Sequence, residues 1–279
     1  MQIEHDKTLT QQAEAVELQA LEALHAVADA PMRAELGLSL QTIGDCLVSI
    51  AAELPASAIT INRAVGLGRQ NPVQPDTIDT IAEHYRQAGV QRYFLQPDPS
   101  TRDEDVAPHC RGAGMERARA WQKFIRGRDE PVPDVSTDLT IRRVGPDQGE
   151  AFAEIVCAAF DLGEEAIPWL ARLPRARGWR VFMGFDGSIP ASAGAVFING
   201  EDAFTDFGAT AVAYRQRGLQ RANLACRVRA ALDLGCRRIH SCTGIAVAGD
   251  PQHSYGNIKK CGFTETHVRE AWVPKQQTV

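Results

Sequence analysis

The sequence predicts an α+β protein in which a mixed, mostly antiparallel central sheet is flanked by helices, with a second α+β domain beside it. The first observation is length, because 279 residues correspond to two domains of roughly 150 residues each. The second is that apolar residues recur at helical spacing in some segments and in short strand-like runs in others. The third is the pair of turns Asp186-Gly187 and Asn199-Gly200, each between strand-like runs, which predicts antiparallel hairpins.

The first half of the chain predicts helices and short strands in alternation. An apolar stripe at three- and four-residue spacing from Leu9 to Ala28 indicates a long helix. A later helix ends at Gly89, a residue suited to a left-handed C-cap. The other elements expected in this half are strands at 46–50, 58–61 and 92–95, helices at 76–88 and 103–111, and extended chain at 116–125.

Residues 126–137 separate the two halves. This segment is polar, contains Pro131 and Pro133, and has no apolar period. Domain boundaries fall in segments of this kind. We therefore expect one domain at 1–130 and another at 138–279.

The second half predicts a strand and helices, then a meander, and then a strand–helix alternation. A helix of about four turns begins near Leu219 and ends at Gly235, since its apolar residues lie on one face. The other elements expected are strands at 139–144, 179–185, 191–198, 203–210, 238–243, 263–268 and 271–273, and helices at 150–160, 164–173 and 253–261.

The two halves share a rhythm of glycine-containing turn, helix, short strand, helix and a further Gly. Gly68 and Gly114 lie 46 residues apart, and Gly218 and Gly262 lie 44 apart. This similarity predicts either an eroded tandem duplication or a coincidence between two α+β domains.

Charge and cysteine content exclude several classes of protein. The formal net charge of −5 argues against a dominant surface for nucleic acid. Seven cysteines form no Cys-x-x-Cys pair and no zinc-like spacing, so we expect reduced thiols and no metal. The first residues lack a signal-peptide pattern, and we find no charge-free apolar run long enough to cross a membrane. The expectation is a cytoplasmic protein that binds neither membrane nor nucleic acid.

The most informative segment lies between a predicted strand and the helix that begins near Leu219. A basic turn with Gly218 opens directly into this helix, where unpaired backbone N–H groups and the helix dipole favour an anion. Gly218 leaves room for close approach of a phosphate. Arg215, Arg217 and Arg221 would add charge-assisted donors. The alternative is a solvated, arginine-rich helix start.

The segment Arg215-Gln216-Arg217-Gly218-Leu219-Gln220 resembles the Gln/Arg-x-x-Gly-x-Gly/Ala signature of the GCN5-related N-acetyltransferase (GNAT) superfamily. It departs from the signature at Gln220, where a small residue is expected. The resemblance covers about residues 138–274 and includes the Gly262-Phe263 ending after the last helix. Residues 62–68 resemble the degenerate acetyltransferase-like domain that precedes the active one in some bacterial members.

The resemblance implies that acetyl-CoA is a co-substrate held between the strands 203–210 and 238–243. Its pantetheine would pair with backbone near 210–212, its pyrophosphate with N–H groups at 217–221, and Asn257 would bind the pantetheine. The cofactor-binding residues so implied are Thr210, Ala211, Val212, Arg215, Gln216, Arg217, Gly218, Leu219, Gln220, Arg221 and Asn257.

The implied chemistry is transfer of an acetyl group from a thioester to an amine, by direct attack in a ternary complex. A backbone N–H near Val212 would stabilise the oxyanion. Many members of the superfamily have a tyrosine at the position of Ile258. Tyr255 lies three residues earlier, on nearly the same face of the predicted helix, and is the candidate acid for the leaving thiolate. The candidates for the general base are Asp206, Glu201, Asp202, His240 and His253. Cys242 is more readily explained as a buried apolar residue than as a nucleophile.

The sequence therefore predicts an N-acetyltransferase for a small-molecule or peptide amine. The amino-terminal half would form one wall of the acceptor site or the interface of a homodimer. Two alternatives stay open: a non-catalytic acyl-CoA-binding regulatory module, and an interaction scaffold without a CoA site.

Overall fold

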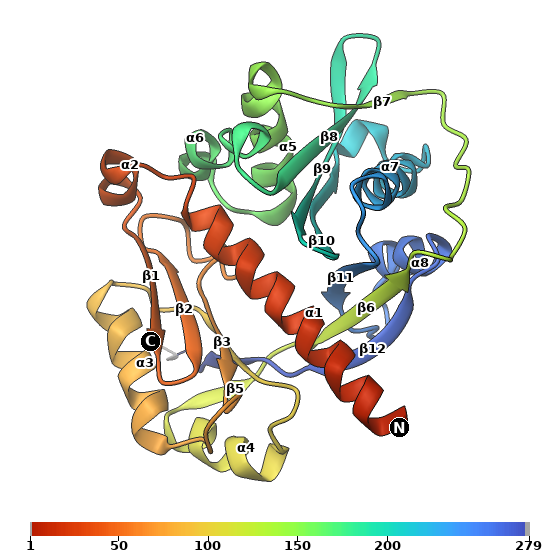
Figure 1. Ribbon diagram of the computed structural model, residues 1–279. Helices are drawn as coiled ribbons and strands as arrows, with labels where there is room; N and C mark the ends of the chain where they lie inside the picture. Colours follow the sequence, from red (N-terminus) through yellow and green to blue (C-terminus); the bar gives the residue numbers. More distant parts are fainter. Residues whose placement is uncertain (1, 277–279) are drawn as a thin grey trace. The chain divides into compact units, whose positions relative to one another are not determined.

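The computed structural model describes residues 2–276, with side chains from residue 8 onward; Met1 and residues 277–279 of the expected domains lie outside this range. The chain divides into two compact units. The large unit comprises Met1–Val27 and Gln122–Thr266, and the small unit comprises Ala28–Trp121 and His267–Val279. Figure 1 follows the chain through both units.

The large unit is built on a seven-stranded sheet with the order β12-β6-β11-β10-β9-β8-β7. Strands β7 to β10 form an antiparallel meander, whereas β10 and β11 run parallel. The predicted mixed and mostly antiparallel sheet is therefore confirmed. The strands are β6 (Trp121–Gly127), β7 (Thr140–Arg143), β8 (Trp179–Asp186), β9 (Ile189–Asn199), β10 (Asp202–Thr210), β11 (Arg238–Gly244) and β12 (Thr264–Arg269).

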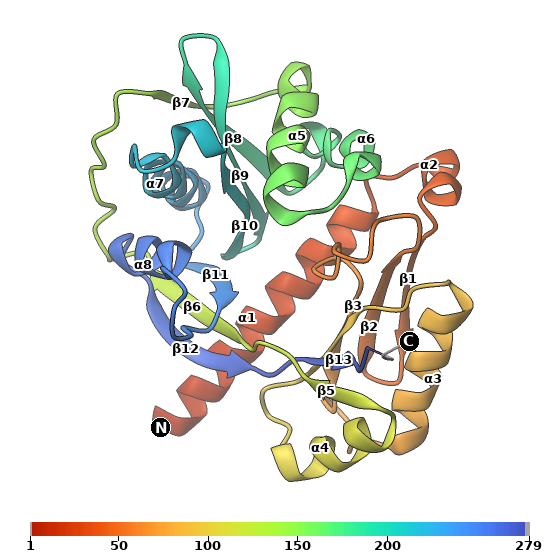
Figure 2. The same cartoon turned by 180° about the vertical axis from the view of Figure 1, so that it is seen from behind.

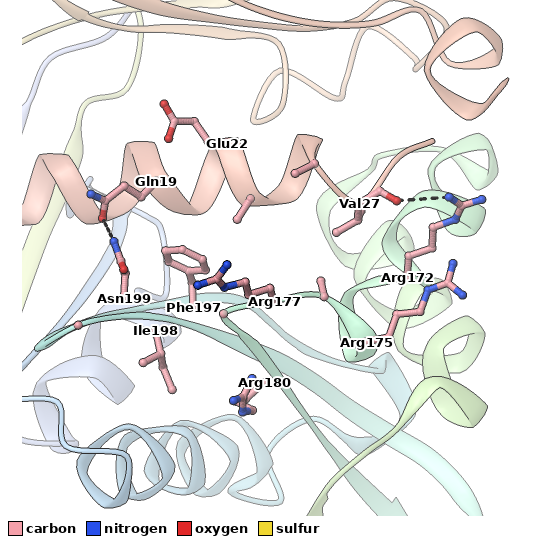
Figure 3. Close-up of a pocket in the computed structure, with 15 residues that line it drawn as sticks. Gln19, Glu22, Val27, Arg172, Arg175, Arg177, Arg180, Phe197, Ile198 and Asn199 are labelled. Carbon is pink, nitrogen blue, oxygen red and sulfur yellow. Dashed lines mark hydrogen bonds between the residues drawn. The ribbon is translucent and has the colours of Figure 1, made fainter. Parts of the chain in front are cut away.

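Helices cover both faces of this sheet. Figure 3 shows α1 on one side of the strands and α7 on the other. The indole Nε1 of Trp169 donates a hydrogen bond to the carbonyl of Leu24, which ties the end of α1 to α6. The helices of the large unit are α1 (Gln2–His25), α5 (Gly149–Phe160), α6 (Ile167–Leu170), α7 (Leu219–Asp233) and α8 (His253–Lys260), with short 3₁₀ turns η1 (Pro146–Gln148), η2 (Glu164–Ala166), η3 (Leu173–Arg175) and η4 (Val212–Tyr214).

The small unit contains a six-stranded sheet with the order β1-β2-β3-β4-β13-β5. Only β3 and β4 are parallel among the pairs with a resolved register. Figure 2 shows α3 and α4 beside this sheet. Its elements are α2 (Ala30–Glu35), β1 (Leu38–Ile43), β2 (Cys46–Ala51), β3 (Arg63–Leu67), α3 (Pro75–Gln87), β4 (Phe94–Pro97), α4 (Asp103–Gly112), β5 (Met115–Arg117) and β13 (Trp272–Pro274).

Both units contain the same order of elements around a parallel strand pair. The small unit has β3-α3-β4-α4-β5, and the large unit has β10-α7-β11-α8-β12. In each, an antiparallel meander precedes the first strand of the pair. The shared rhythm seen in the sequence thus corresponds to a shared arrangement of strands and helices.

The two sheets cut across the expected ranges 1–130 and 138–279. Strand β6, from the first half of the chain, belongs to the sheet of the large unit, and β13, near the carboxyl end, inserts between β4 and β5 of the small unit. Helix α1 belongs to the large unit as well. Composition marks a linker by its polarity, but only backbone pairing decides to which sheet a strand belongs.

Several elements of the first half differ from the predictions, and α2 and β3 are among those that were not expected. Residues 58–61, expected as a strand, form a turn in which the N–H of Ile61 donates to the carbonyl of Ala58. Strand β1 was not expected, because half of its residues face solvent and its apolar alternation is weak. Among the described residues, no helix is long and apolar enough to cross a membrane.

We expect Trp272→Ala to destabilise the small unit by about 3–5 kcal/mol, because Trp272 is 1% exposed and packs in its core. Trp272 also lies 4.6 Å below the guanidinium of Arg117. Urea unfolding followed by circular dichroism measures the change. Val268→Ala, at a side chain that is 42% exposed, is the control. A loss below about 1 kcal/mol at Trp272 would contradict the assignment of β13 to this core.

Candidate functional site

The parallel strands β10 and β11 pair over only three residues. Asp202, Ala203 and Phe204 lie opposite Arg238, Ile239 and His240. Strand β10 continues to Thr210 and β11 to Gly244, but the register between them ends at Phe204 and His240. Beyond this point each strand presents backbone groups that its neighbour does not use in a ladder, and a ligand can bind to such groups.

A β-bulge follows directly in β10. Its register with β9 shifts between Asp206 and Ala209, and Phe207 has a left-handed φ of 53°. A non-glycine residue with positive φ is strained and persists only where its surroundings hold it. The strain therefore lies at the level where β10 and β11 separate.

The side chain that holds the bulge is Arg227 of α7. Its Nη1 donates to the carbonyl of Asp206 at 3.0 Å and to the carbonyl of Ala195 at 3.2 Å. Arg227 is 4% exposed, and burial lowers its pKa to about 10, so that it stays charged at neutral pH. A Cβ at Gly194 would lie 2.8 Å from its Nε, so glycine is required there. A buried positive charge thus lies beneath the bulge.

The turn after β10 contains two left-handed residues immediately before α7. Chain direction changes through η4, and Gln216 and Gly218 then adopt left-handed φ values of 67° and 77°. Helix α7 begins at the next residue, with Gly218 as its N-cap. Left-handed residues in such a turn aim successive backbone N–H groups at one point, where the helix dipole also favours negative charge. The turn expected from the sequence is therefore present.

The three arginines near this turn differ in their surroundings. Arg217 pairs with Asp138 and, at 3.2 Å, with Asp186, so its guanidinium is engaged within the protein. Arg215 is exposed, whereas the Nε of Arg221 is buried without an acceptor among the described residues. Thus Arg217 braces the turn from the side, and Arg215 is the arginine most open to solvent.

Residues 210–212 differ from one another in hydrogen bonding and in exposure. The N–H of Ala211 donates to the carbonyl of Ala191 at 3.0 Å, which extends the pairing of β10 with β9. Thr210 ends β10, and its buried Oγ1 has no hydrogen-bond partner within residues 8–276. Val212 lies in η4 and is 74% exposed. The N–H of Ala211 therefore faces β9 and away from β11.

Gln220, the departure from the expected small residue, connects α7 to α8. Its Nε2 donates to the Oγ of Ser254 at 2.9 Å, and its Oε1 accepts from the Nδ2 of Asn257 at 2.7 Å. Asn257 therefore shares a contact with the first turn of α7. The structure brings together two residues, Gln220 and Asn257, that the sequence assigned to the same ligand.

Tyr255 lies on the side of α8 that packs against β6. Its ring meets Phe124 edge-on at 5.2 Å, and its hydroxyl is hydrogen-bonded to Glu265 of β12. This bond raises the pKa of Tyr255, and the same bond lowers the pKa of Glu265. The hydroxyl is protonated at neutral pH, as a proton donor must be, but it points to a carboxylate on β12. Ile258, one turn later, is 5% exposed and belongs to the core.

The candidate bases fall into two groups. Asp202 binds Arg238 at 2.8 Å through both carboxylate oxygens, and the Nε2 of the fully buried His240 lies 2.9 Å from Asp202. Burial lowers the pKa of His240, so it is neutral at pH 7. These residues occupy the paired end of β10 and β11, and Glu201 joins them through Arg237 and Arg238.

Asp206 is the candidate base that lies in the bulge itself. One of its oxygens accepts the N–H of Phe207 at 2.8 Å, which orients the carboxylate. His253 is exposed at the start of α8, and Cys242 is half-buried on β11. In the described part of the chain we find no group of three or more His, Cys, Asp or Glu side chains that could hold a metal ion.

The small unit has a corresponding turn between β3 and α3, but its own side chain occupies it. Asp45 accepts the backbone N–H groups of Gln70 at 2.8 Å and Asn71 at 2.7 Å. Burial opposes ionisation of Asp45, but these bonds outweigh it and lower its pKa. Helix α3 begins with Pro75, which lacks an N–H. An internal carboxylate thus binds two backbone N–H groups of this turn.

Comparison with known proteins gives a result at the level of fold. No family model matches the chain, and no curated protein matches its sequence. A GCN5-related N-acetyltransferase from Kribbella flavida is similar in structure, with a TM-score of 0.61, 15% identity, and coverage of 91% of this chain and 96% of that one. The chain has the GNAT fold.

Two further solved structures agree with this result. A GCN5-related N-acetyltransferase from Sphaerobacter thermophilus has a TM-score of 0.59 and 13% identity, over 82% of this chain and 80% of that one. A tandem GNAT protein from the clavulanic acid biosynthesis pathway has a TM-score of 0.56 and 13% identity, over 84% and 79%. Both helix-flanked sheets of this chain thus have counterparts in known folds.

Sequence reasoning missed Arg227 and Asp45. Arg227 lies in a helix rich in arginine, and its burial depends on two strand glycines, Gly194 and Gly208, that are far away in the sequence. Glycine inside a strand does indicate close approach of another group, which was the available signal. Asp45 gave no signal, because its partners lie 25 residues further along the chain.

The ion pairs of Asp202 give a stability prediction. Burial by itself would raise the pKa of Asp202, but the hydrogen bonds from Arg238 and His240 outweigh it and lower the pKa from 3.8 to about 2. A carboxylate with a lowered pKa stabilises the fold above its unfolded-state pKa and loses this contribution as the pH falls through its folded-state pKa.

We therefore expect Asp202→Asn to lower the free energy of unfolding at pH 7 by about 2 kcal/mol. The difference from the wild type should shrink as the pH falls from 3.8 towards 2, where Asp202 becomes protonated. Urea titrations at several pH values measure it. Asp129→Asn, at an exposed position, is the control. A difference that does not depend on pH would contradict the ion-pair explanation.

Proposed function

We propose that this protein is an acetyl-CoA-dependent N-acetyltransferase that acts on a small-molecule or peptide amine. The observation that carries the proposal is the left-handed turn at Gln216 and Gly218, which opens α7 beside the diverging ends of β10 and β11. A turn of this kind binds a phosphate group. The GNAT fold of the chain supports acetyl-CoA as the ligand that carries it.

The residues around the turn fit a pyrophosphate. Backbone N–H groups at 217–221 would bind its oxygens, since the first N–H groups of α7 have no acceptor within the helix. Arg215 is exposed at the turn and would add a charged donor. The pantetheine would follow the open edge of β10 near Thr210, with Asn257 and Gln220 alongside. Acetyl-CoA supplies the activated acetyl group.

In the proposed reaction the amine nitrogen attacks the thioester carbonyl, the C–S bond breaks, and the thiolate leaves with or without a proton from an acid. An amine with a pKa near that of lysine, about 10.4, must first lose a proton. Asp206 is the candidate that lies in the bulge, and we propose it as the base. The strained bulge and the charge of Arg227 beneath it would keep β10 in position while negative charge develops on the carbonyl oxygen.

A non-catalytic acyl-CoA-binding module is the second candidate. It is favoured by Gln220, whose side chain spans from α7 to Ser254 and Asn257, and by Ile258, which is buried where an acid would be expected. Release of CoA thiol in the presence of a panel of amines separates the two. Binding of acetyl-CoA without any turnover would favour the non-catalytic module.

We expect Gly218→Trp to abolish binding of acetyl-CoA, because an indole would fill the space that the phosphates need. Gly187→Trp is a matched control: Gly187 also has a positive φ, and a Cβ there would meet no atom within 4 Å, but it lies in the β8–β9 hairpin. Calorimetric titration with acetyl-CoA measures binding, and circular dichroism verifies the fold. Equal affinity in the two variants would contradict the proposed site.

Tyr255→Phe tests the candidate acid. If the hydroxyl protonates the leaving thiolate, kcat should fall by about 100-fold or more, while the KM for acetyl-CoA stays the same. Tyr93→Phe removes a hydroxyl from a buried ring of the small unit and is the control. An unchanged kcat would mean that Tyr255 serves only to pack on Phe124 and to bind Glu265.

A further inference from the structure

A second candidate site lies in the large unit, between the last turns of α1 and the ends of β8 and β9. It is a cavity of about 1000 Å³ that is open to solvent (Figure 3). Cavities of this size accept organic molecules of ordinary ligand dimensions. It adjoins the β9–β10 hairpin, whereas the turn at Gly218 follows the opposite end of β10. The two candidate sites are therefore separate.

Small residues leave the space for this cavity. Ala23 of α1 and Ala26, just after its end, line the cavity with short side chains. Gly178 has a φ of 83°, and a Cβ there would lie 2.6 Å from the ring of Phe197. The Nδ2 of Asn199 donates to the Oε1 of Gln19 at 2.9 Å, which fixes one end of the cavity. The cavity is thus bounded by defined contacts.

The cavity is strongly basic although the chain as a whole is acidic. Four arginines line it, namely Arg172, Arg175, Arg177 and Arg180, and Glu22 is the one acidic side chain in its lining. The formal charge of the whole chain is −5. Figure 3 shows the guanidinium groups of the four arginines pointing in different directions, so they form no single cluster, but their summed positive charge favours an anion in the cavity.

Three of these arginines have no carboxylate partner in the described part of the chain. Arg172 donates to the carbonyl of Val27 at 3.3 Å, but no ion pair involves Arg175, Arg177 or Arg180. In Figure 3 the side chain of Arg177 extends towards Phe197. The guanidinium groups of Arg175 and Arg177, which are exposed residues, are consequently open to an external ligand.

Arg180 lies apart from the other three arginines. It pairs with Val196 of β9 on the face of the sheet that α7 covers, whereas Phe197 points to the face that α1 covers (Figure 3). The Nη1 of Arg180 donates to the carbonyl of Trp179 at 2.7 Å. The ring of Phe197, next to Arg177, would contact the body of an organic ligand.

We propose that this cavity binds an organic oxyanion, a carboxylate or a phosphate ester with an apolar body. Planar guanidinium groups match both anions, because each offers two oxygens to the paired N–H donors. The apolar body would lie against Phe197. This proposal does not depend on the acetyltransferase proposal, because it uses none of the residues at the Gly218 turn.

Calorimetric titration with phenyl phosphate, benzoate and inorganic phosphate, at constant ionic strength, tests the proposal. The first two probes distinguish a phosphate ester from a carboxylate, and the third measures what the anion alone contributes. We expect the wild type to bind at least one organic probe more tightly than inorganic phosphate. Failure of both organic probes to bind at millimolar concentration would overturn the proposal.

Variants assign the binding to this cavity. We expect Arg175→Ala with Arg177→Ala to weaken binding by about tenfold or more, and Arg177→Lys to weaken it less, because lysine keeps the charge but loses the planar pair of donors. Arg92→Ala, at an exposed arginine of the small unit, is the control. Circular dichroism verifies that each variant is folded. Equal affinity in the double variant and the control would overturn the proposal.

The Gly218→Trp variant separates this proposal from the proposed function. If the probes bind in the cavity, their affinity is unchanged in Gly218→Trp even though acetyl-CoA no longer binds. If the affinity for the probes falls in Gly218→Trp and is kept in the double arginine variant, the anion binds at the turn and the cavity proposal is wrong.

Discussion

The early end of pairing between β10 and β11 is the constraint on which the candidate site depends. Parallel strands normally continue their ladder, since unpaired backbone groups are costly when buried. Here the ladder stops after Phe204, and a bulge at Asp206–Ala209 turns the chain. Arg227 satisfies two carbonyls at that level from beneath the sheet. Its burial costs desolvation energy, which these hydrogen bonds and the charge of Asp206 offset in part.

The turn before α3 in the small unit and the turn before α7 in the large unit differ in what contacts them. In the small unit Asp45 provides an internal carboxylate for the N–H groups of Gln70 and Asn71. In the large unit Gly218 is exposed, and the neighbouring acids Asp138 and Asp186 bind Arg217 instead. The protein itself thus occupies one turn, and the other is the turn at which we propose that a ligand binds.

Helices α7 and α8 are joined by side-chain hydrogen bonds that the sequence signature does not predict. Gln220 replaces a small residue and uses both ends of its amide, one towards Ser254 and one towards Asn257. These bonds hold the first turn of α7 beside α8. Gln220 departs from the signature, and by itself this departure suggests a weakened site. In the structure, however, Gln220 connects α7 to α8, the two helices that border the candidate site.

The sequence by itself determined the fold class, most of the helices and strands, and the turn before α7, because periodicity, hairpin dipeptides and glycine at a helix start are local properties. Tertiary structure alone decided that β6 and β13 belong to sheets built mainly from the other half of the chain, and that Arg227 supports the bulge. It also decided that Asp45 fills one turn and that four arginines line one cavity. These features depend on residues brought together across long stretches of chain, and no local pattern records such pairing.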